Sequence, residues 1–123
     1  MSVETELRDQ IIAGVETVES RVYPVVLPKD AVFPAIRYNR ISTIRGYTLN
    51  GRDCFPAARF QVDVFADKYT TVQAAWGLLR IALDGFSSVE IEYITLDNET
   101  EDFDDELKLY RVIGDFVVQY KES

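Results

Sequence analysis

The sequence has 123 residues, 47% of them hydrophobic and 12% aromatic, which predicts one globular domain over residues 1–123 with a packed core. A net charge of −8 argues against binding nucleic acid through a general basic surface. Histidine is absent and Cys54 is the single cysteine, which excludes histidine-based catalytic pairs, histidine metal sites and a disulfide within the chain. The sequence shows no secretion signal or membrane span, so we expect a protein that folds in the cytosol.

The first predicted element is an amphipathic helix over residues 2–22, because apolar residues recur every three or four positions. These residues are Val3, Leu7, Ile11, Val15, Val18 and Val22. Three prolines between residues 23 and 34 exclude regular helix there. Alternation of apolar and polar residues then predicts a strand over residues 35–41, followed by a long connection over residues 43–56.

Residues 59–86 predict a strand that leads into an amphipathic helix. Phe60, Val62, Val64 and Ala66 alternate and therefore share one face of the strand. Asp67 is the predicted helix cap, and Gly85 is the predicted stop, since glycine adopts the left-handed conformation without steric cost. The buried stripe of the helix comprises Val72, Ala75, Trp76, Leu79, Leu83 and Phe86.

The same helix carries a second apolar stripe on a different face, formed by Ala74, Leu78 and Ile81. We expect the first helix to pack on this stripe, while the main stripe packs on the sheet. The alternative is that another subunit buries part of this surface.

The remaining sequence predicts a strand over residues 89–96, in which Val89, Ile91 and Tyr93 alternate with glutamates, and a strand over residues 107–121. Between them lies the acidic segment, residues 97–106, with seven carboxylates and no basic residue. The predicted fold class is α+β, a mainly antiparallel sheet of about four strands with two helices packed on one face.

The acidic segment invites a metal-site interpretation, because hard cations prefer oxygen ligands. An EF-hand loop needs glycine and glutamate where this segment has Asp102 and Lys108, so we expect a solvated, mobile hairpin tip. No phosphate-binding glycine loop is present, and no carboxylate pair is placed in an apolar pocket. The sequence therefore predicts no enzyme activity, no catalytic residue, no cofactor and no metal site.

Charge is distributed unevenly along the chain. Five arginines and one aspartate fall in the basic segment, residues 36–59, whereas residues 87–106 carry nine carboxylates and no cation. Two such segments can pair within one molecule, can pair head-to-tail with a second copy, or can be unrelated solvated loops.

Several short segments together resemble the tail completion, or tail terminator, proteins of long-tailed bacteriophages and prophages. The similarity covers nearly the full length and lies in residues 21–24, 27–28, 33–38, 60–66, 83–85 and 110–120. Each of these pieces is a packing or turn signature, and the family has no catalytic motif to carry over. The strongly acidic segment is where this chain departs from what we expect of relatives.

The resemblance implies a non-enzymatic role in the virion tail, in a protein assembled in the cytoplasm of the bacterial host. Such proteins form a ring, typically hexameric, on the head-proximal end of the tail tube. The ring stops tube polymerisation and offers a surface to the head-connector, or neck, protein, and DNA passes through its bore without specific binding. The implied partners are therefore the protein itself, the tube protein and the connector, with no membrane.

On this interpretation the two charged segments carry the assembly contacts. We expect Arg45, Tyr47, Arg52 and Phe55 to reach a neighbouring subunit or the tube, and Asp102, Asp104 and Asp105 to face a neighbour's basic hairpin or the lumen. The alternatives are a neck or head-closure adaptor with the same ring geometry, and a small acidic metal- or ligand-binding protein.

Overall fold

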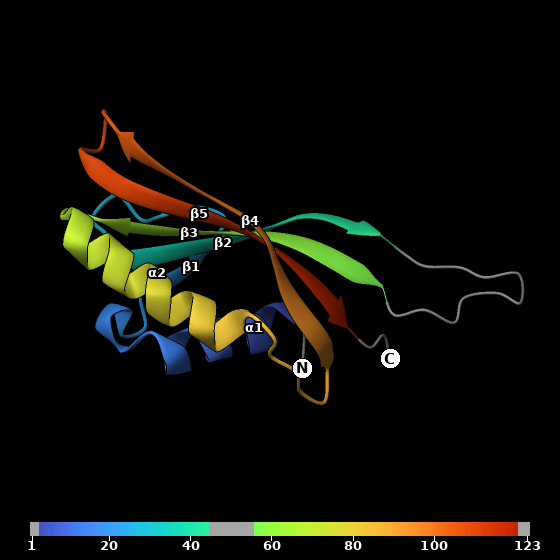
Figure 1. The fold of residues 1–123 in the computed structure, drawn as a ribbon. Helices are drawn as coiled ribbons and strands as arrows, with labels where there is room; N and C mark the ends of the chain where they lie inside the picture. The colour runs from blue at the N-terminus through green and yellow to red at the C-terminus, as the bar shows by residue number, and fades with distance from the viewer. Residues whose placement is uncertain (1–2, 45–55, 121–123) are drawn as a thin grey trace, which may run out of the picture.

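The computed structural model describes residues 3–44 and 56–120, in which two helices lie on one face of a five-stranded sheet (Figure 1). In chain order the elements are α1 (Val3–Gly14), the 3-10 helix η1 (Glu16–Val18), β1 (Val22–Pro24), β2 (Ala35–Ile44), β3 (Ala57–Ala66), α2 (Tyr69–Leu83), β4 (Ile91–Asp104) and β5 (Leu109–Tyr120). The strand order is β1-β2-β3-β5-β4, with β1 parallel to β2 and the other neighbours antiparallel. The predicted α+β class is confirmed, and the strand beyond the expected four is the short β1.

The core lies between the sheet and the helices, and its centre is the β3–α2 unit predicted from the sequence. The alternating β3 residues Phe60, Val62, Val64 and Ala66 are fully buried. The predicted stripe of α2 faces them, with Val72, Ala75, Trp76, Leu79 and Leu83 buried and Phe86 packed at the margin. Strand alternation and helical periodicity therefore predicted this interface correctly.

The first helix is shorter than predicted, because α1 ends at Gly14 and not near residue 22. Val15 and Val18 are still buried, but they sit in and before η1, and Val22 belongs to β1. A Cβ on Gly14 would lie 2.4 Å from the Cβ of Ala82, so the backbones of α1 and α2 approach closely there. The apolar residues keep their spacing of three to four although the backbone changes from α1 to η1 and then to β1. Spacing alone therefore could not predict where the helix ends.

The ends of α2 agree with the prediction in part. Gly85 has a φ of 83° just beyond the helix, as expected for a glycine stop. Asp67 is not the cap, because the N-cap position is Lys68, which makes no side-chain capping hydrogen bond. Neither helix in the described part of the chain is long and apolar enough to cross a membrane.

β4 starts later and runs further than the predicted strand over residues 89–96. Val89 precedes β4 and is 83% exposed. The pairing with β5 shifts register between Ile91 and Tyr93, so Ile91 and Ile94 are buried while Tyr93 is half exposed. A bulge adds one residue to a strand and reverses the alternation after it, which explains why strict alternation misplaced Tyr93.

Candidate assembly surfaces

The acidic segment is mostly β-strand, so the prediction of a solvated, mobile hairpin tip is wrong. β4 extends to Asp104 and pairs with β5 up to that residue, with Asp102 opposite Arg111. The turn is confined to residues 105–108. The high charge of the segment led to the prediction of a loop. Backbone hydrogen bonds and cross-strand side-chain partners can nevertheless stabilise polar residues on an edge strand.

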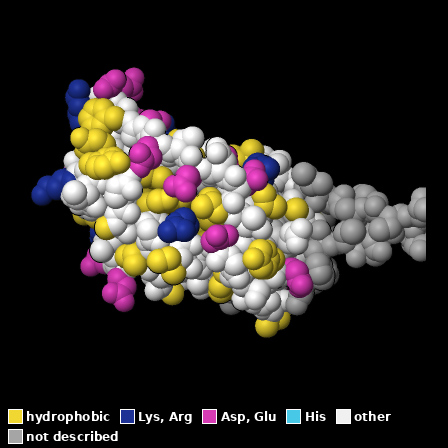
Figure 2. All heavy atoms as spheres, viewed as in Figure 1, with side chains coloured by type: hydrophobic (Ala, Val, Ile, Leu, Met, Phe, Trp, Pro, Cys, Tyr) yellow, Lys and Arg dark blue, Asp and Glu magenta, His cyan; other side chains and the backbone are white. Residues whose placement is uncertain are grey.

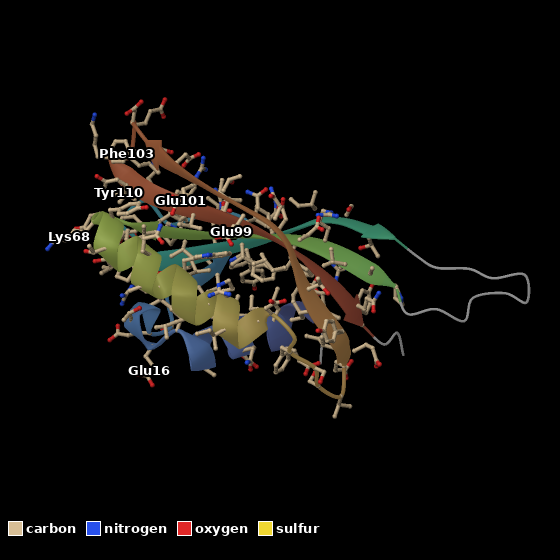
Figure 3. All side chains as sticks on the ribbon, in the orientation of Figure 1. Glu16, Lys68, Glu99, Glu101, Phe103 and Tyr110 are labelled. Atoms are coloured by element: carbon tan, nitrogen blue, oxygen red, sulfur yellow. The ribbon has the colours of Figure 1, made fainter. Side chains whose placement is uncertain are left out.

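Most carboxylates of the acidic segment have partners in the same chain. Asp97 pairs with Arg59 at 2.9 Å, which joins the acidic strand to the basic segment within one molecule. Glu99 and Glu101 are labelled along β4 in Figure 3, and Trp76 Nε1 on α2 donates a hydrogen bond of 2.8 Å to Glu99. These contacts orient the acidic side chains, so the segment presents an ordered charged surface.

Asp102 forms the strongest of these contacts, a two-point ion pair with Arg111. The Nε and Nη2 atoms of Arg111 donate to the two carboxylate oxygens at 2.9 and 2.5 Å. The hydrogen bond from Arg111 is the main reason why the pKa of Asp102 is lowered, and partial burial opposes it. Asp102 is therefore a carboxylate at neutral pH, held on the surface of β4.

Asp104 and Asp105 lie beside Asp102 at the β4–β5 turn. One carboxylate oxygen of Asp104 accepts hydrogen bonds of 3.0 Å from the backbone N–H groups of Glu106 and Leu107, so its side chain shapes the turn. Asp105 is exposed in the turn. The structure thus brings the three predicted acidic residues together at one end of the sheet, which we call the turn end.

Arg45, Tyr47, Arg52 and Phe55, the predicted contact residues of the basic segment, lie outside the described residues. The strands that flank them are described: β2 ends at Ile44, which pairs with Ala57 at the start of β3. Ala57 pairs with Gln119 near the end of β5, whereas Ala66 pairs with Tyr110 near its start. Ile44 and Ala57, the paired residues nearest to this segment, therefore lie at the end of the sheet opposite the turn end, as the labelled strands show (Figure 1).

Within residues 3–44 and 56–120, no three Asp, Glu, His or Cys side chains are grouped so that they could hold a metal ion. Strand geometry contributes, because carboxylates that share a face of β4 are two residues, or about 7 Å, apart along the strand. Several of them are also engaged by arginine, tryptophan or backbone donors, as described above.

The second stripe of α2 is not covered by the first helix, so that prediction is wrong. Leu78 is 40% exposed, Ile81 is 75% exposed and Ala74 is also exposed. α1 contacts α2 on another side, where Gln10 Nε2 donates to the carbonyl of Ala82 at 2.9 Å. Figure 2 shows hydrophobic and acidic side chains interspersed on the face that carries α2.

An aromatic cluster at the turn end was missed in the sequence. Tyr110 contacts Phe103 and Tyr69 edge-on, with ring centroids 4.9 and 5.6 Å apart. Figure 3 places Phe103 and Tyr110 together at this end, near Lys68. Phe103 is 43% exposed. The available signal was Phe103 itself, an aromatic residue surrounded by carboxylates in the acidic segment.

A pocket of about 380 Å³ also lies at the turn end. Its lining comes from the β1–β2 connection and from the start of β5: Leu27, Pro28, Lys29, Phe33, Leu107 and Leu109. Leu109 is buried but does not belong to the core cluster beneath the helices, and the same holds for Ala35 and Phe65. Because Leu109 and the inward-facing Tyr110 are adjacent on β5, the pocket lies on the opposite side of the sheet from the helices.

Comparison with known proteins agrees with this picture. The model of the family described as "Tail completion protein gp17" matches residues 9–121. A solved chain from the virion of a native gene transfer agent particle has a TM-score of 0.77 and is 15% identical, with 98% of this chain and 96% of that chain covered. This likeness supports the fold. No curated protein matches the sequence.

The fold and its surfaces define the class of protein: a small α+β structural protein whose distinctive features are strand ends, edges and exposed apolar patches. The chain belongs to the tail completion protein gp17 family. The resemblance inferred from its packing and turn segments is thereby confirmed.

Proposed function

We propose that the chain is a tail terminator that forms a hexameric ring on the head-proximal end of a phage tail tube. The family match over residues 9–121 carries this proposal. The ring ends tube polymerisation and provides the surface to which the head connector binds. The protein acts through shape and symmetry in this role, as a part of the virion tail assembled in the host cytoplasm.

The positions of the two charged regions support a ring. The described residues that flank segment 45–55, Ile44 and Ala57, lie at the opposite end of the sheet from the turn end, so a contact between the segment and the turn end joins different surfaces of two copies. Such a head-to-tail contact produces a closed ring when its rotation closes. In this proposal Arg45, Tyr47, Arg52 and Phe55 contact a neighbouring subunit or the tube, and Asp102, Asp104 and Asp105 face a neighbour or the lumen.

The excess of carboxylates suits a channel for DNA. The chain carries 21 acidic residues against 13 basic ones, and a negative lining does not retain passing phosphates. The ring therefore allows DNA to pass and contacts protein on its two faces, the tube on one and the connector on the other.

A tube-assembly experiment tests the function. Tube protein from the matching phage is polymerised with and without this chain and imaged by electron microscopy. We expect tubes capped at one end and shorter on average when the chain is present. Tubes of unchanged length without caps contradict the proposal, and binding to the connector protein without any binding to tubes identifies a neck adaptor.

Charge reversal tests the assigned contacts. We expect Arg45→Glu with Arg52→Glu to abolish capping while the circular dichroism spectrum stays unchanged, because the core is built from described residues of the helices and strands. Arg80→Glu, which reverses an exposed charge on α2, is the matched control and leaves capping intact. Normal capping by the double variant shows that these arginines make no assembly contact.

A further inference from the structure

We infer that the pocket at the turn end receives segment 45–55 of a second copy of the chain, with Tyr47 and Phe55 supplying the apolar contact. The inference rests on the proposed ring and names the acceptor site within it. The acceptor is built from described residues of the β1–β2 connection and the β4–β5 turn.

The pocket has the chemistry of a protein-binding site. Leu27, Phe33, Leu107 and Leu109 line it with apolar groups, and Leu107 is 56% exposed. The connection that forms one wall also exposes Val26 and Val32, at 69% and 61%. Apolar side chains gathered in this way around a concave site lower the free energy when a partner's aromatic ring covers them.

A molecule cannot fill its own pocket with this segment. β3 runs for ten residues from Ala57, beside the segment, to Ala66, which pairs with Tyr110 next to the pocket. At about 3.4 Å per residue that distance is roughly 30 Å. Segment 45–55 must leave Ile44 and return to Ala57, so its midpoint reaches at most about 22 Å even when fully extended. The occupant therefore comes from another copy.

The charges on the two sides are complementary. Residues 104–108 at the pocket rim carry Asp104, Asp105 and Glu106 against Lys108, while the adjacent Lys29 and Asp30 cancel each other. Segment 45–55 carries two arginines and one aspartate. Opposite charges steer two surfaces into one orientation, even where each exposed pair adds little affinity.

After one contact the pair of copies still has one unused segment 45–55, on the first copy, and one unused pocket, on the second. A second copy that places its segment in the first copy's pocket still offers its own pocket to a third. Contacts of this kind continue until the ring closes, so the same pair of surfaces is used at every junction.

Two complementary variants test the contact one junction at a time. A ¹⁵N-labelled chain with Tyr47→Ser and Phe55→Ser keeps its pocket, and an unlabelled chain with Leu107→Asp keeps its segment. Neither variant can assemble with copies of itself, but one molecule of each can form a single contact. We expect saturable NMR shifts in the labelled chain at the amides of Leu27, Phe33 and Leu109.

The controls separate the pocket from the rest of the surface. Adding Leu107→Asp to the labelled chain should weaken binding by at least about tenfold, because a charge then replaces a leucine that the contact covers. Adding Val89→Asp, at an exposed apolar position just before the other end of β4, leaves binding unchanged. The spectrum of each variant reports whether it is folded, and Leu107→Ser replaces Leu107→Asp if the latter unfolds.

Absence of shifts at millimolar concentration, or shifts confined to other surfaces, overturns the inference. Either result together with normal tube capping leaves the terminator function in place and assigns segment 45–55 to the tube. Saturable pocket shifts without any capping support the contact and contradict the terminator function.

Discussion

At the scale of single residues, two glycines in the helices have opposite roles. A Cβ at Gly14 would lie 2.4 Å from the Cβ of Ala82, whereas a Cβ at Gly77 would meet no atom within 4 Å. We expect Gly14→Ala to lower the free energy of unfolding by about 1–3 kcal/mol, because the two helices must separate. Gly77→Ala is the control and should raise it by about 0.5–1 kcal/mol. Urea unfolding measures both, and equal effects would contradict the close approach.

The ion pair between Asp102 and Arg111 predicts a pH dependence. The pKa of Asp102 is lowered from 3.8 in the folded protein, so the pair stabilises the fold at pH values above 3.8. That contribution is lost as the pH falls below 3.8 through the folded pKa. Because both side chains are partly exposed, Asp102→Asn should lower the free energy of unfolding by only about 0.2–1 kcal/mol near neutrality.

Urea unfolding of the wild type and Asp102→Asn at pH 7 and in acid measures this difference. It should be present at pH 7 and absent in acid, where both chains lack the charge. Arg111→Gln should reproduce the loss, since either change removes the pair. A difference that persists unchanged in acid would show that the asparagine acts through packing.

Local chemistry predicted some residue roles and not others. Gly85 was predictable because its positive φ admits few other residues. The choice of Asp67 as a helix cap failed, whereas Asp104 organises a turn through its side chain. Both aspartates precede a change in backbone direction, and the sequence does not show which backbone N–H groups end up within reach of the side chain.

At the scale of elements, the packing of α2 on β5 depends on Trp76 lying over Gly114. A Cβ on Gly114 would come within 2.4 Å of the Trp76 ring. Gly114→Ala should therefore destabilise the fold by about 1–3 kcal/mol and change the fluorescence of the single tryptophan. Trp76→Phe in the same chain makes room, so the cost of the alanine should shrink in a double-mutant cycle. Additive effects would contradict the contact.

The elements that could be predicted are those in which a single spacing of apolar residues gives the buried positions over the whole element. The β3–α2 unit is of this kind, since Phe60 to Ala66 alternate and α2 keeps its stripe to Leu83. α1 and β4 are not, because Gly14 ends one helix within a continuous apolar spacing and a bulge after Ile91 reverses the alternation. The spacing of apolar residues shows which positions are buried. The backbone conformation at those positions also depends on partners that are distant in the sequence, such as Ala82.

The candidate surfaces were predictable only through their charge. The grouping of Asp102, Asp104 and Asp105 at the turn end follows from their closeness in sequence. The pocket does not, because Leu27 and Phe33 meet Leu107 and Leu109 only through the crossover that makes β1 parallel to β2. A three-residue strand such as β1 leaves too little pattern in the sequence to be recognised.

At the scale of the whole molecule, the proposed contact between the basic segment 45–55 and the acidic turn end predicts that assembly depends on salt. Screening shortens the range of electrostatic attraction from about 10 Å at 0.1 M salt to about 3 Å at 1 M. The rate of ring formation or of tube capping should therefore fall as sodium chloride is raised, while the apolar contacts keep the final complex together. Stopped-flow light scattering measures the rate, and a rate independent of salt would contradict steering by charge.

The edge of the sheet formed by β4 has a consequence for solubility. Residues 84–88 form hydrogen bonds with the outer edge of β4 as far as Leu96, but beyond Leu96 that edge has no neighbouring strand in the described chain. Open strand edges are templates for the uncontrolled strand pairing that leads to amyloid. Carboxylates recur along this edge, and like charges stacked in register repel each other. The acidity of β4 therefore protects the protein from joining through its strand edges into fibrils.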